Sequence, residues 1–421
     1  MQNVIDFGAK GDGKTLDTAA IQAAIDAGGE VYFPKGVYIT GTLYLQSNGG
    51  LNLSSGAVLR ASHNREDYNA DDFCPQNRVF VSESVTGAHL ITAVNKKNIF
   101  IKGEGVIDGD SHYWVNESNK EEGAETFLPN PERPGQMIFL CECQNVSITD
   151  VNLRNGSYWH LFLHGCEDVK IRGINIKGEI QQYTNDGIDL DCCQRVTVSD
   201  CNIEVGDDAL TLRGYDETLL SSRTCEDVVI NNCVLRSYNA FAIRIGVGEG
   251  YIRNCSFSNL AIHGSNHAIG ITSRFSPQRA NGVKVENISF NNVTAKVRRF
   301  FEIRTNNRDG FPPFENECYI RNINISNVFA ECEVSSYIYS YEKGKVYDVN
   351  FQNVNMLYGG VGPAPERNTE GVWGCLSTEN AIEIHDSEKI TFKNCSIKFK
   401  DTATGWKKEL ELFNSRQINF N

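Results

Sequence analysis

The 421-residue sequence predicts an all-β fold, a right-handed parallel β-helix with an N-terminal capping helix, and three observations predict it. Similar segments recur along the chain at intervals that indicate a solenoid or an array. Apolar residues within these segments alternate with period two, which favours strands over helical repeats. Each copy also joins two short strands rich in β-branched residues through a turn bearing Asp or Asn, which fits the coils of a parallel β-helix.

The four clearest copies of the repeat each begin with a cysteine. They start at Cys143, Cys166, Cys193 and Cys225, so that successive copies lie 23, 27 and 32 residues apart. Equivalent positions on successive coils stack, so we expect an interior ladder of thiols that act as small buried hydrophobic groups. Cys192 is expected to point to the opposite face of a strand from Cys193. Because no C-x-x-C motif occurs, the sequence predicts no zinc site. We also expect no other metal and no cofactor.

The N-terminal residues are expected to cover the end of the solenoid, because an open coil exposes core and strand edges. Residues 1–45 are predicted to form this cap and the first coil. Asp17 is expected to cap a helix that runs to about Ala27 and stops at Gly28–Gly29. The predicted apolar face of the helix comprises Leu16, Ile21, Ala24 and Ile25.

The rest of the chain is predicted to continue as one domain. Residues 46–421 are expected to form successive β-coils. Two polar or Gly/Pro-rich insertions interrupt the pattern, near 110–135 and 357–380. Loops of this length often build the walls of a binding groove, so we expect them to line one here.

The segment Gly8–Thr15 (GAKGDGKT) matches the phosphate-binding pattern G-x-x-x-x-G-K-[ST] at every required position. Such a loop needs a strand that delivers backbone N–H groups to phosphates at the start of a helix, within a parallel α/β sheet. This chain instead turns to β-coils after Gly29. We therefore expect the glycines to let the backbone turn tightly, and we expect no nucleotide partner.

Composition and charge restrict the classes of partner. The formal net charge is −13 at pH 7, so broad nucleic-acid binding is not expected. An acidic glycan remains compatible, because a few arginines in a cleft outweigh a distant negative surface. No apolar run is long enough for a membrane span, and the N-terminus has no secretion signal. We expect no membrane partner and a cytoplasmic protein as the sequence stands, or an extracellular or periplasmic one if a signal was removed. The oligomeric state stays open.

Two acidic clusters carry the predicted chemistry. Asp186 lies in N-D-G-I-D, and the pair Asp207 and Asp208 follows in G-D-D, 21 and 22 residues further on. That separation is about one coil, so the three carboxylates are expected on neighbouring rungs of one sheet. At such range they cannot all ionise freely, and at least one carboxyl pKa should rise. A protonated carboxylic acid beside an ionised carboxylate is what hydrolysis of a glycosidic bond requires.

With these motifs the sequence resembles glycoside hydrolase family 28, the polygalacturonases of the pectin-lyase-like β-helix group. The resemblance covers at least residues 3–215, from FGAKGDGKTLDTAAIQ through GEGVIDG and NDGIDLDCC to GDDALTLRG. It implies a metal-free inverting hydrolase that acts on a pectic or related polysaccharide or oligosaccharide. Asp207 is then implied to protonate the leaving oxygen, while Asp186 and Asp208 activate water across a gap of roughly 6.5–9.5 Å.

The sequence departs from the family on later coils. Family members carry an H-G pair where this chain has Ala240 and Phe241, and the R-[IL]-K triplet that holds the sugar carboxylate is missing. The nearest substitutes are Arg244, Arg274 and the triplet that ends in Arg304 (Glu302-Ile303-Arg304), with His267 in place of the absent histidine. The departure leaves room for another uronide or a neutral sugar. The predicted substrate-binding residues are Trp159, His160, Arg213, Arg244, His267, Arg274 and Arg304.

Trp159 and His160 lie one coil before Asp186. They are predicted to supply a stacking platform and a polar contact for a sugar ring. Core packing is the alternative for Trp159, and a solvated surface position is the alternative for each arginine.

Two other functions remain open. A polysaccharide lyase on the same fold would use Ca²⁺ held by aspartates, with Asp189 and Asp191 as extra ligands and Arg244 as the base. A binding or structural β-helix would use its aspartates only to cap turns, as is expected of Asp168.

Overall fold

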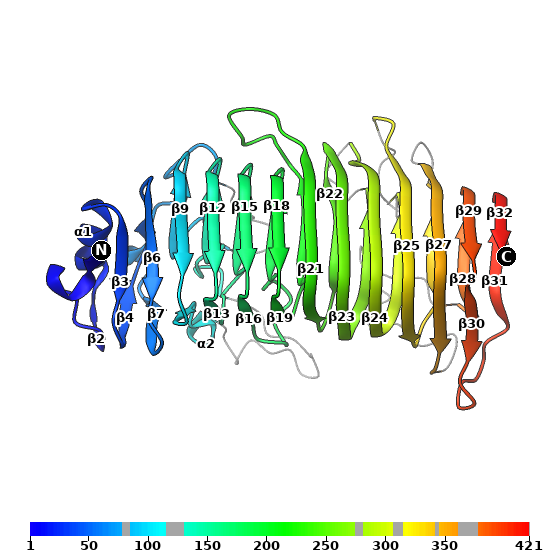
Figure 1. The fold of residues 1–421 in the computed structure, drawn as a ribbon, viewed down its shortest axis with the longest axis horizontal. Coiled ribbons are helices and arrows are strands. Elements are labelled where there is room, and N and C mark those ends of the chain that lie inside the picture. The colour runs from blue at the N-terminus through cyan, green and yellow to red at the C-terminus, as the bar shows by residue number, and fades with distance from the viewer. Residues whose placement is uncertain are drawn as a thin grey trace. The chain divides into compact units, whose positions relative to one another are not determined.

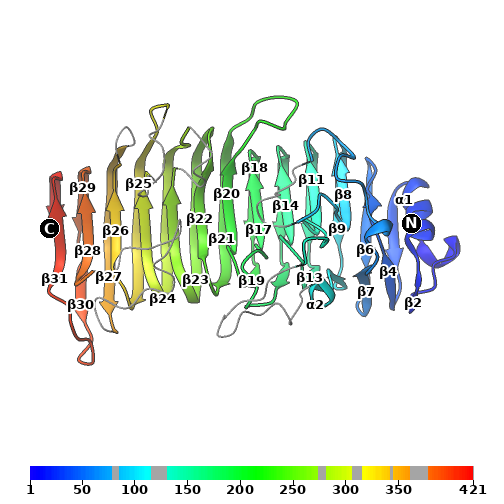
Figure 2. The same cartoon turned by 180° about the vertical axis from the view of Figure 1, so that it is seen from behind.

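The computed structural model describes residues 1–77, 85–114, 130–273, 281–305, 315–341, 345–360 and 378–420. The chain divides into two compact units. The first comprises Met1–Thr211 and Asp216–Arg223, and the second comprises Leu212–Tyr215 and Thr224–Asn421. Strands dominate each unit (Figures 1 and 2).

The strands of the first unit form three parallel stacks, in which each strand pairs with its equivalent on the next coil. The first stack contains β1 (Gln2–Asn3), β3 (Glu30–Phe33), β6 (Gly49–Leu53), β9 (Lys97–Lys102), β12 (Gln144–Thr149), β15 (Glu167–Arg172) and β18 (Gln194–Ser199). The second contains β2 (Asp12–Leu16), β4 (Gly36–Thr40), β7 (Ala57–Ala61), β10 (Val106–Asp108), β13 (Asn152–Arg154), β16 (Asn175–Lys177) and β19 (Asn202–Val205). The third contains β5 (Leu43–Tyr44), β8 (Ile91–Val94), β11 (Ile138–Cys141), β14 (Leu161–His164) and β17 (Ile188–Asp191). The prediction of a parallel β-helix is confirmed.

The second unit repeats this plan with longer strands. Its first stack contains β21 (Cys225–Ser237), β23 (Tyr251–Thr272), β24 (Lys284–Arg304), β25 (Tyr319–Cys332), β27 (Lys345–Tyr358), β29 (Glu388–Lys393) and β32 (Arg416–Phe420), and β30 (Ser396–Phe399) pairs with the end of β27. Its third stack contains β22 (Phe241–Gly248), the last parts of β23 and β24, β26 (Ser336–Tyr339), β28 (Asn380–His385) and β31 (Lys408–Phe413). The strand β20 (Leu210–Gly214) contributes residues to both units.

Apolar residues of like size stack in register inside the coils. In the first unit Val146 pairs with Val169 on the next coil, and Val169 pairs with Val196. All three are at most 3% exposed. Their neighbours along β12, β15 and β18 reach solvent at least in part, so the period-two pattern is the alternation of core and surface positions.

The corners of the coils depend on residues with left-handed backbone. Asn145, Asp168 and Arg195 occupy one equivalent corner on successive coils, with φ of 57°, 56° and 55°. Asn and Asp tolerate this region better than other residues with side chains, because their short polar groups form local hydrogen bonds. Asp168 holds this left-handed backbone within β15, and its carboxylate accepts from Arg195 Nε at 2.7 Å.

The cysteine ladder forms as predicted within the first unit. The thiols of Cys143, Cys166 and Cys193 donate to carbonyl groups of the preceding coil, namely Ala93 O at 3.4 Å, Leu140 O at 3.2 Å and Leu163 O at 3.3 Å. Cys225 begins β21 in the second unit, where its partner is Ile252. The expectation for Cys192 is wrong, because it lies in the turn after β17 with φ of 53° and is as buried as Cys193. None of the described cysteines forms a disulfide bond.

The helix near the N-terminus forms as α1 (Thr18–Asp26), and Gly28 and Gly29 follow it in left-handed conformations. Ile21, Ala24 and Ile25 are buried as predicted. Leu16 does not belong to this apolar face, because it ends β2 and is 47% exposed. The role of the helix as a cap stays a prediction.

The segment Gly8–Thr15, which matches the phosphate-binding pattern, donates backbone hydrogen bonds to the carboxylate of Asp17. Asp17 makes no side-chain bond to the start of α1. Its oxygens instead accept from the backbone amides of Lys10 at 2.7 Å and Gly11 at 3.0 Å. Gly8, Gly11 and Gly13 all have positive φ, which is the turning role that the sequence predicts.

The remaining helical segments are short: α2 (Ser111–Trp114) and the 3-10 turns η1 (Val4–Phe7) and η2 (Arg65–Asp67). Most of both predicted groove-forming insertions lies outside the described residues, which omit 115–129 and 361–377. Among the described helices, none is long and apolar enough to cross a membrane.

Candidate active site

Asp186, Asp207 and Asp208 lie on adjacent coils of the first unit, as their spacing predicts. The Gly187 amide donates to the Asp208 carbonyl at 2.9 Å, so the backbone beside Asp186 is bonded directly to that of Asp208. The side chains of Asp186 and Asp208 are 2% and 1% exposed, while Asp207 is partly exposed. Asp207 is thus partly accessible, whereas Asp186 and Asp208 are shielded from bulk water.

The side chain of Asn185 fixes the turn that carries Asp207. Its Oδ1 accepts from the amides of Gly206 at 2.8 Å and Asp207 at 3.1 Å, and its Nδ2 donates to Glu179 O at 2.7 Å. The Asp208 amide in turn donates to Asp207 Oδ1 at 2.9 Å. A buried amide that binds two successive backbone donors holds the turn in one conformation.

His160 does not have the predicted contact with a sugar. It is fully buried, and its Nε2 accepts from the Gly156 amide at 3.0 Å. Its Nδ1 therefore carries the proton and donates to the Asp186 carbonyl at 2.9 Å. Burial lowers the pKa of His160 to about 4, so the ring is neutral near pH 7. The sequence correctly indicated that His160 lies near Asp186. Because the ring is buried, its hydrogen-bond partners are backbone groups and not a sugar.

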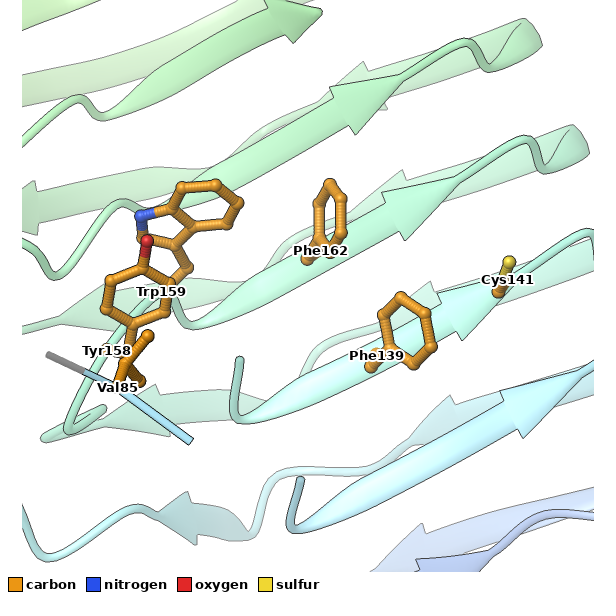
Figure 3. Close-up of a cluster of buried hydrophobic side chains, with 6 residues drawn as sticks. All are labelled: Val85, Phe139, Cys141, Tyr158, Trp159 and Phe162. Carbon is orange, nitrogen blue, oxygen red and sulfur yellow. The ribbon is translucent and has the colours of Figure 1, made fainter. Parts of the chain in front are cut away.

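Trp159 packs in an aromatic cluster of the first unit (Figure 3). Its ring stacks on Tyr158 at 4.8 Å and meets Phe162 edge-on at 5.3 Å between ring centroids. Only 3% of Trp159 is exposed, so its role as a sugar platform is contradicted and core packing is the better interpretation. The members of the cluster are Val85, Phe139, Cys141, Tyr158, Trp159 and Phe162.

The aspartates considered as calcium ligands are buried among side chains of the third stack. Asp191 Oδ2 lies 3.3 Å from His164 Nδ1, and neither side chain reaches solvent. Asp189 is equally buried and lies in register with Phe162 (β14 and β17, Figure 2). In the described part of the chain, no three His, Cys, Asp or Glu side chains are grouped to hold a metal ion. The arrangement of these aspartates does not favour a calcium-dependent lyase.

In the second unit, Glu302 is the centre of a buried charged cluster. Its carboxylate oxygens lie 2.7 Å from Arg304 Nη2, 3.5 Å from His267 Nε2 and 3.9 Å from Arg299 Nη1. Tyr337 on β26 is the register partner of Glu302. The tertiary structure therefore brings the predicted residues His267 and Arg304 together.

The charges of this cluster do not cancel. Burial by itself would raise the pKa of Glu302, but the adjacent Arg304 and Arg299 guanidinium groups hold it well below its usual value. Burial lowers the pKa of His267 to about 3. The group near pH 7 therefore contains two cations, one anion and a neutral imidazole, which leaves an excess positive charge.

The other predicted arginines differ in position. Arg244 is 7% exposed, and its guanidinium carbon lies 5.2 Å from the centroid of the Phe241 ring. Phe241 also stacks on His267, with 4.4 Å between the ring centroids. Arg213 is 5% exposed in β20. Arg274 lies outside the described residues.

Sequence reasoning missed Asn185, Arg299 and Tyr337. Asn185 precedes Asp186 directly, and an Asn before a predicted catalytic Asp was a usable signal. Tyr337 had none, because its place beside Glu302 depends on the register of β24 with β26. Arg299 lies on β24 itself, three residues before Glu302.

Comparisons with known proteins identify the family of this chain. Residues 75–364 match the model of Glycosyl hydrolases family 28. An exo-poly-alpha-D-galacturonosidase of Dickeya chrysanthemi is 26% identical over 343 residues, which cover 70% of this chain and 56% of that protein. The chain spans about half the length of the curated relatives it matches.

Two solved structures show the same fold. The Family 28 exopolygalacturonase of Yersinia enterocolitica matches with a TM-score of 0.75 and 21% identity, over 99% of this chain and 78% of that one. A hyperthermoactive exopolygalacturonase of Thermotoga maritima matches with a TM-score of 0.64 and 21% identity, over 99% and 91% of the two chains.

Proposed function

This chain belongs to glycosyl hydrolases family 28, and from that premise we propose that it hydrolyses glycosidic bonds of a pectic polysaccharide or oligosaccharide by inversion. Asp207 acts as the acid that protonates the leaving oxygen. Asp186 and Asp208 act as the base that activates water. The mechanism requires neither a metal nor a cofactor, because the carboxyl groups supply both proton transfers.

The observation that carries this proposal is that Asp186 and the pair Asp207–Asp208 lie on adjacent coils, which are joined there by a backbone hydrogen bond. The Gly187 amide bonds to the Asp208 carbonyl, and Asn185 holds the Asp207 turn. Asp207 is the more accessible of the three, which suits a group that must reach the oxygen of a bound polymer. The two shielded carboxylates suit the activation of a single water molecule.

The cluster around Glu302 supports a carboxylated sugar as the substrate. Arg299 and Arg304 exceed the charge of Glu302 by one, and guanidinium groups pair with carboxylates in a bidentate geometry. Similar proteins are named exo-poly-alpha-D-galacturonosidase and exopolygalacturonase. We therefore propose a galacturonide as the substrate.

The test is a panel of pectic oligosaccharides, including trigalacturonate, with the product anomers followed by NMR. We expect a new reducing end of inverted configuration. The Asp207→Asn variant should lose at least about 1000-fold in kcat while its far-UV circular dichroism stays native. Retention of configuration, an unsaturated product that absorbs in the ultraviolet, or full activity of Asp207→Asn would each contradict the proposal.

A further inference from the structure

We propose that His160 is a positioning residue for Asp186, and that the neutral imidazole fixes where the Asp186 carboxylate lies. The inference rests on the proposed function, in which Asp186 helps to activate water. His160 touches no substrate in this role, because it is fully buried.

Two donors of His160 converge on one acceptor. The backbone amide and the ring Nδ1 of His160 both donate to the Asp186 carbonyl, each at 2.9 Å. The backbone bond alone is a normal rung between coils. The ring bond adds a second direction of constraint, so that the peptide carrying Asp186 cannot rotate without losing a buried hydrogen bond.

The ring lies in a slot that two glycines make possible. A Cβ at Gly156 would lie 3.1 Å from the His160 Cδ2, and a Cβ at Gly178 would lie 2.8 Å from its Cε1. Gly156 also donates its amide to Nε2, which fixes the tautomer that donates to Asp186. The slot thus selects both the place and the protonation state of the imidazole.

A positioning role predicts a specific kinetic effect. Activation of water by a carboxylate depends on its placement, and a misplacement of about 1 Å costs on the order of 100-fold in rate. Binding of the polymer does not depend on the Asp186 peptide in the same way. Loss of the ring bond should therefore lower kcat and leave KM nearly unchanged.

Two substitutions at His160 separate its two bonds. His160→Asn places an amide nitrogen near the position of Nδ1 and keeps a donor for Asp186. His160→Gln places its amide near the position of Nε2 and keeps only the contact with Gly156. With trigalacturonate as substrate, we expect His160→Gln to lose 10- to 100-fold in kcat and His160→Asn to stay within about 3-fold of the wild type.

His89 provides the matched control. It is also fully buried, its Nδ1 contacts Gln136 O at 2.8 Å, and burial lowers its pKa to about 4. His89→Gln should lose stability as His160→Gln does, but keep the wild-type kcat. If His160→Gln does not fold, Gly156→Ala replaces it, because the added methyl crowds the ring and should lower kcat in the same way.

Equal kcat values for His89→Gln and His160→Gln would overturn the inference. A His160→Asn enzyme as slow as His160→Gln would do the same. So would a Gly156→Ala enzyme with the wild-type kcat. Crystal structures of the substrate-free variants give a readout besides activity, and an unmoved Asp186 carbonyl in His160→Gln would also overturn it. Failure of the proposed function looks different. In that case Asp186→Asn is as active as the wild type, or the wild type does not cleave trigalacturonate, while the carbonyl still moves.

Discussion

Glu302 holds guanidinium and imidazole groups although none of its side chain reaches solvent. Such a carboxylate has lost its hydration, and only the charges and donors around it compensate for that loss. Its partners depend on it in return, because Arg299 and Arg304 are themselves largely removed from water. At the scale of the residue, the negative charge of the Glu302 carboxylate therefore allows Arg299 and Arg304 to stay buried.

We expect Glu302→Gln to lower the free energy of unfolding by about 3–5 kcal/mol, because it leaves two buried cations without their counter-charge. Chemical denaturation measures this change. Glu331→Gln is the control, since its partner Lys400 lies at 2.8 Å but both side chains are more than a quarter exposed. That variant should change stability by at most about 1 kcal/mol, and a similar cost for both variants would contradict the role of burial.

Asparagine side chains stack along the corners of the coils in the same way as the core residues stack inside them. Asn145 Nδ2 donates to Asn98 Oδ1 at 2.8 Å, and Asn98 Nδ2 donates to Asn48 Oδ1 at 2.7 Å. All three residues have left-handed φ. At the scale of the element, this left-handed backbone explains why turns bearing Asn recur in the sequence.

A pair of variants at Asn145 tests this explanation. Asn145→Gly should change the free energy of unfolding by only a few tenths of a kcal/mol, because glycine adopts a φ of 57° without strain. Asn145→Val should cost about 1–2 kcal/mol, because a β-branched residue is strained there. Thermal unfolding followed by circular dichroism compares the two, and equal stabilities would show that the backbone conformation is not the cause.

Three buried histidines make the stability of the whole chain depend on pH. Burial lowers the pKa of His89 and His160 to about 4 and that of His267 to about 3, against an ordinary value of 6.5. Between those values the unfolded chain binds more protons than the folded chain, so the free energy of unfolding rises with pH in this window. The folded state is therefore favoured above pH 6.5 and weakened below it.

We expect the free energy of unfolding to fall as pH is lowered from about 6.5 to 4, by roughly 3 kcal/mol for each such histidine. Urea denaturation at a series of pH values measures the slope. His89→Gln removes one titrating group from the folded and unfolded states, so its slope should be smaller. A wild-type slope of zero in this window would contradict the burial of all three rings.

The sequence by itself determined the class of fold, the repeat and the three carboxylates. Periodicity and repeat length follow from the alternation of core and surface along a strand, which any window of the chain displays. The spacing of Asp186, Asp207 and Asp208 is about one coil for the same reason. These features are local or periodic, so no knowledge of distant contacts was needed.

Only the tertiary structure decided which polar residues face a ligand and which face the backbone. Trp159 and His160 read as groups for binding sugar, yet packing buries both. His267 and Tyr337 reach Glu302 from neighbouring coils, and Asp17 binds the amides of Lys10 and Gly11 instead of the start of its helix. Burial and register are set by segments far apart in the chain, and a pattern within one segment does not contain them.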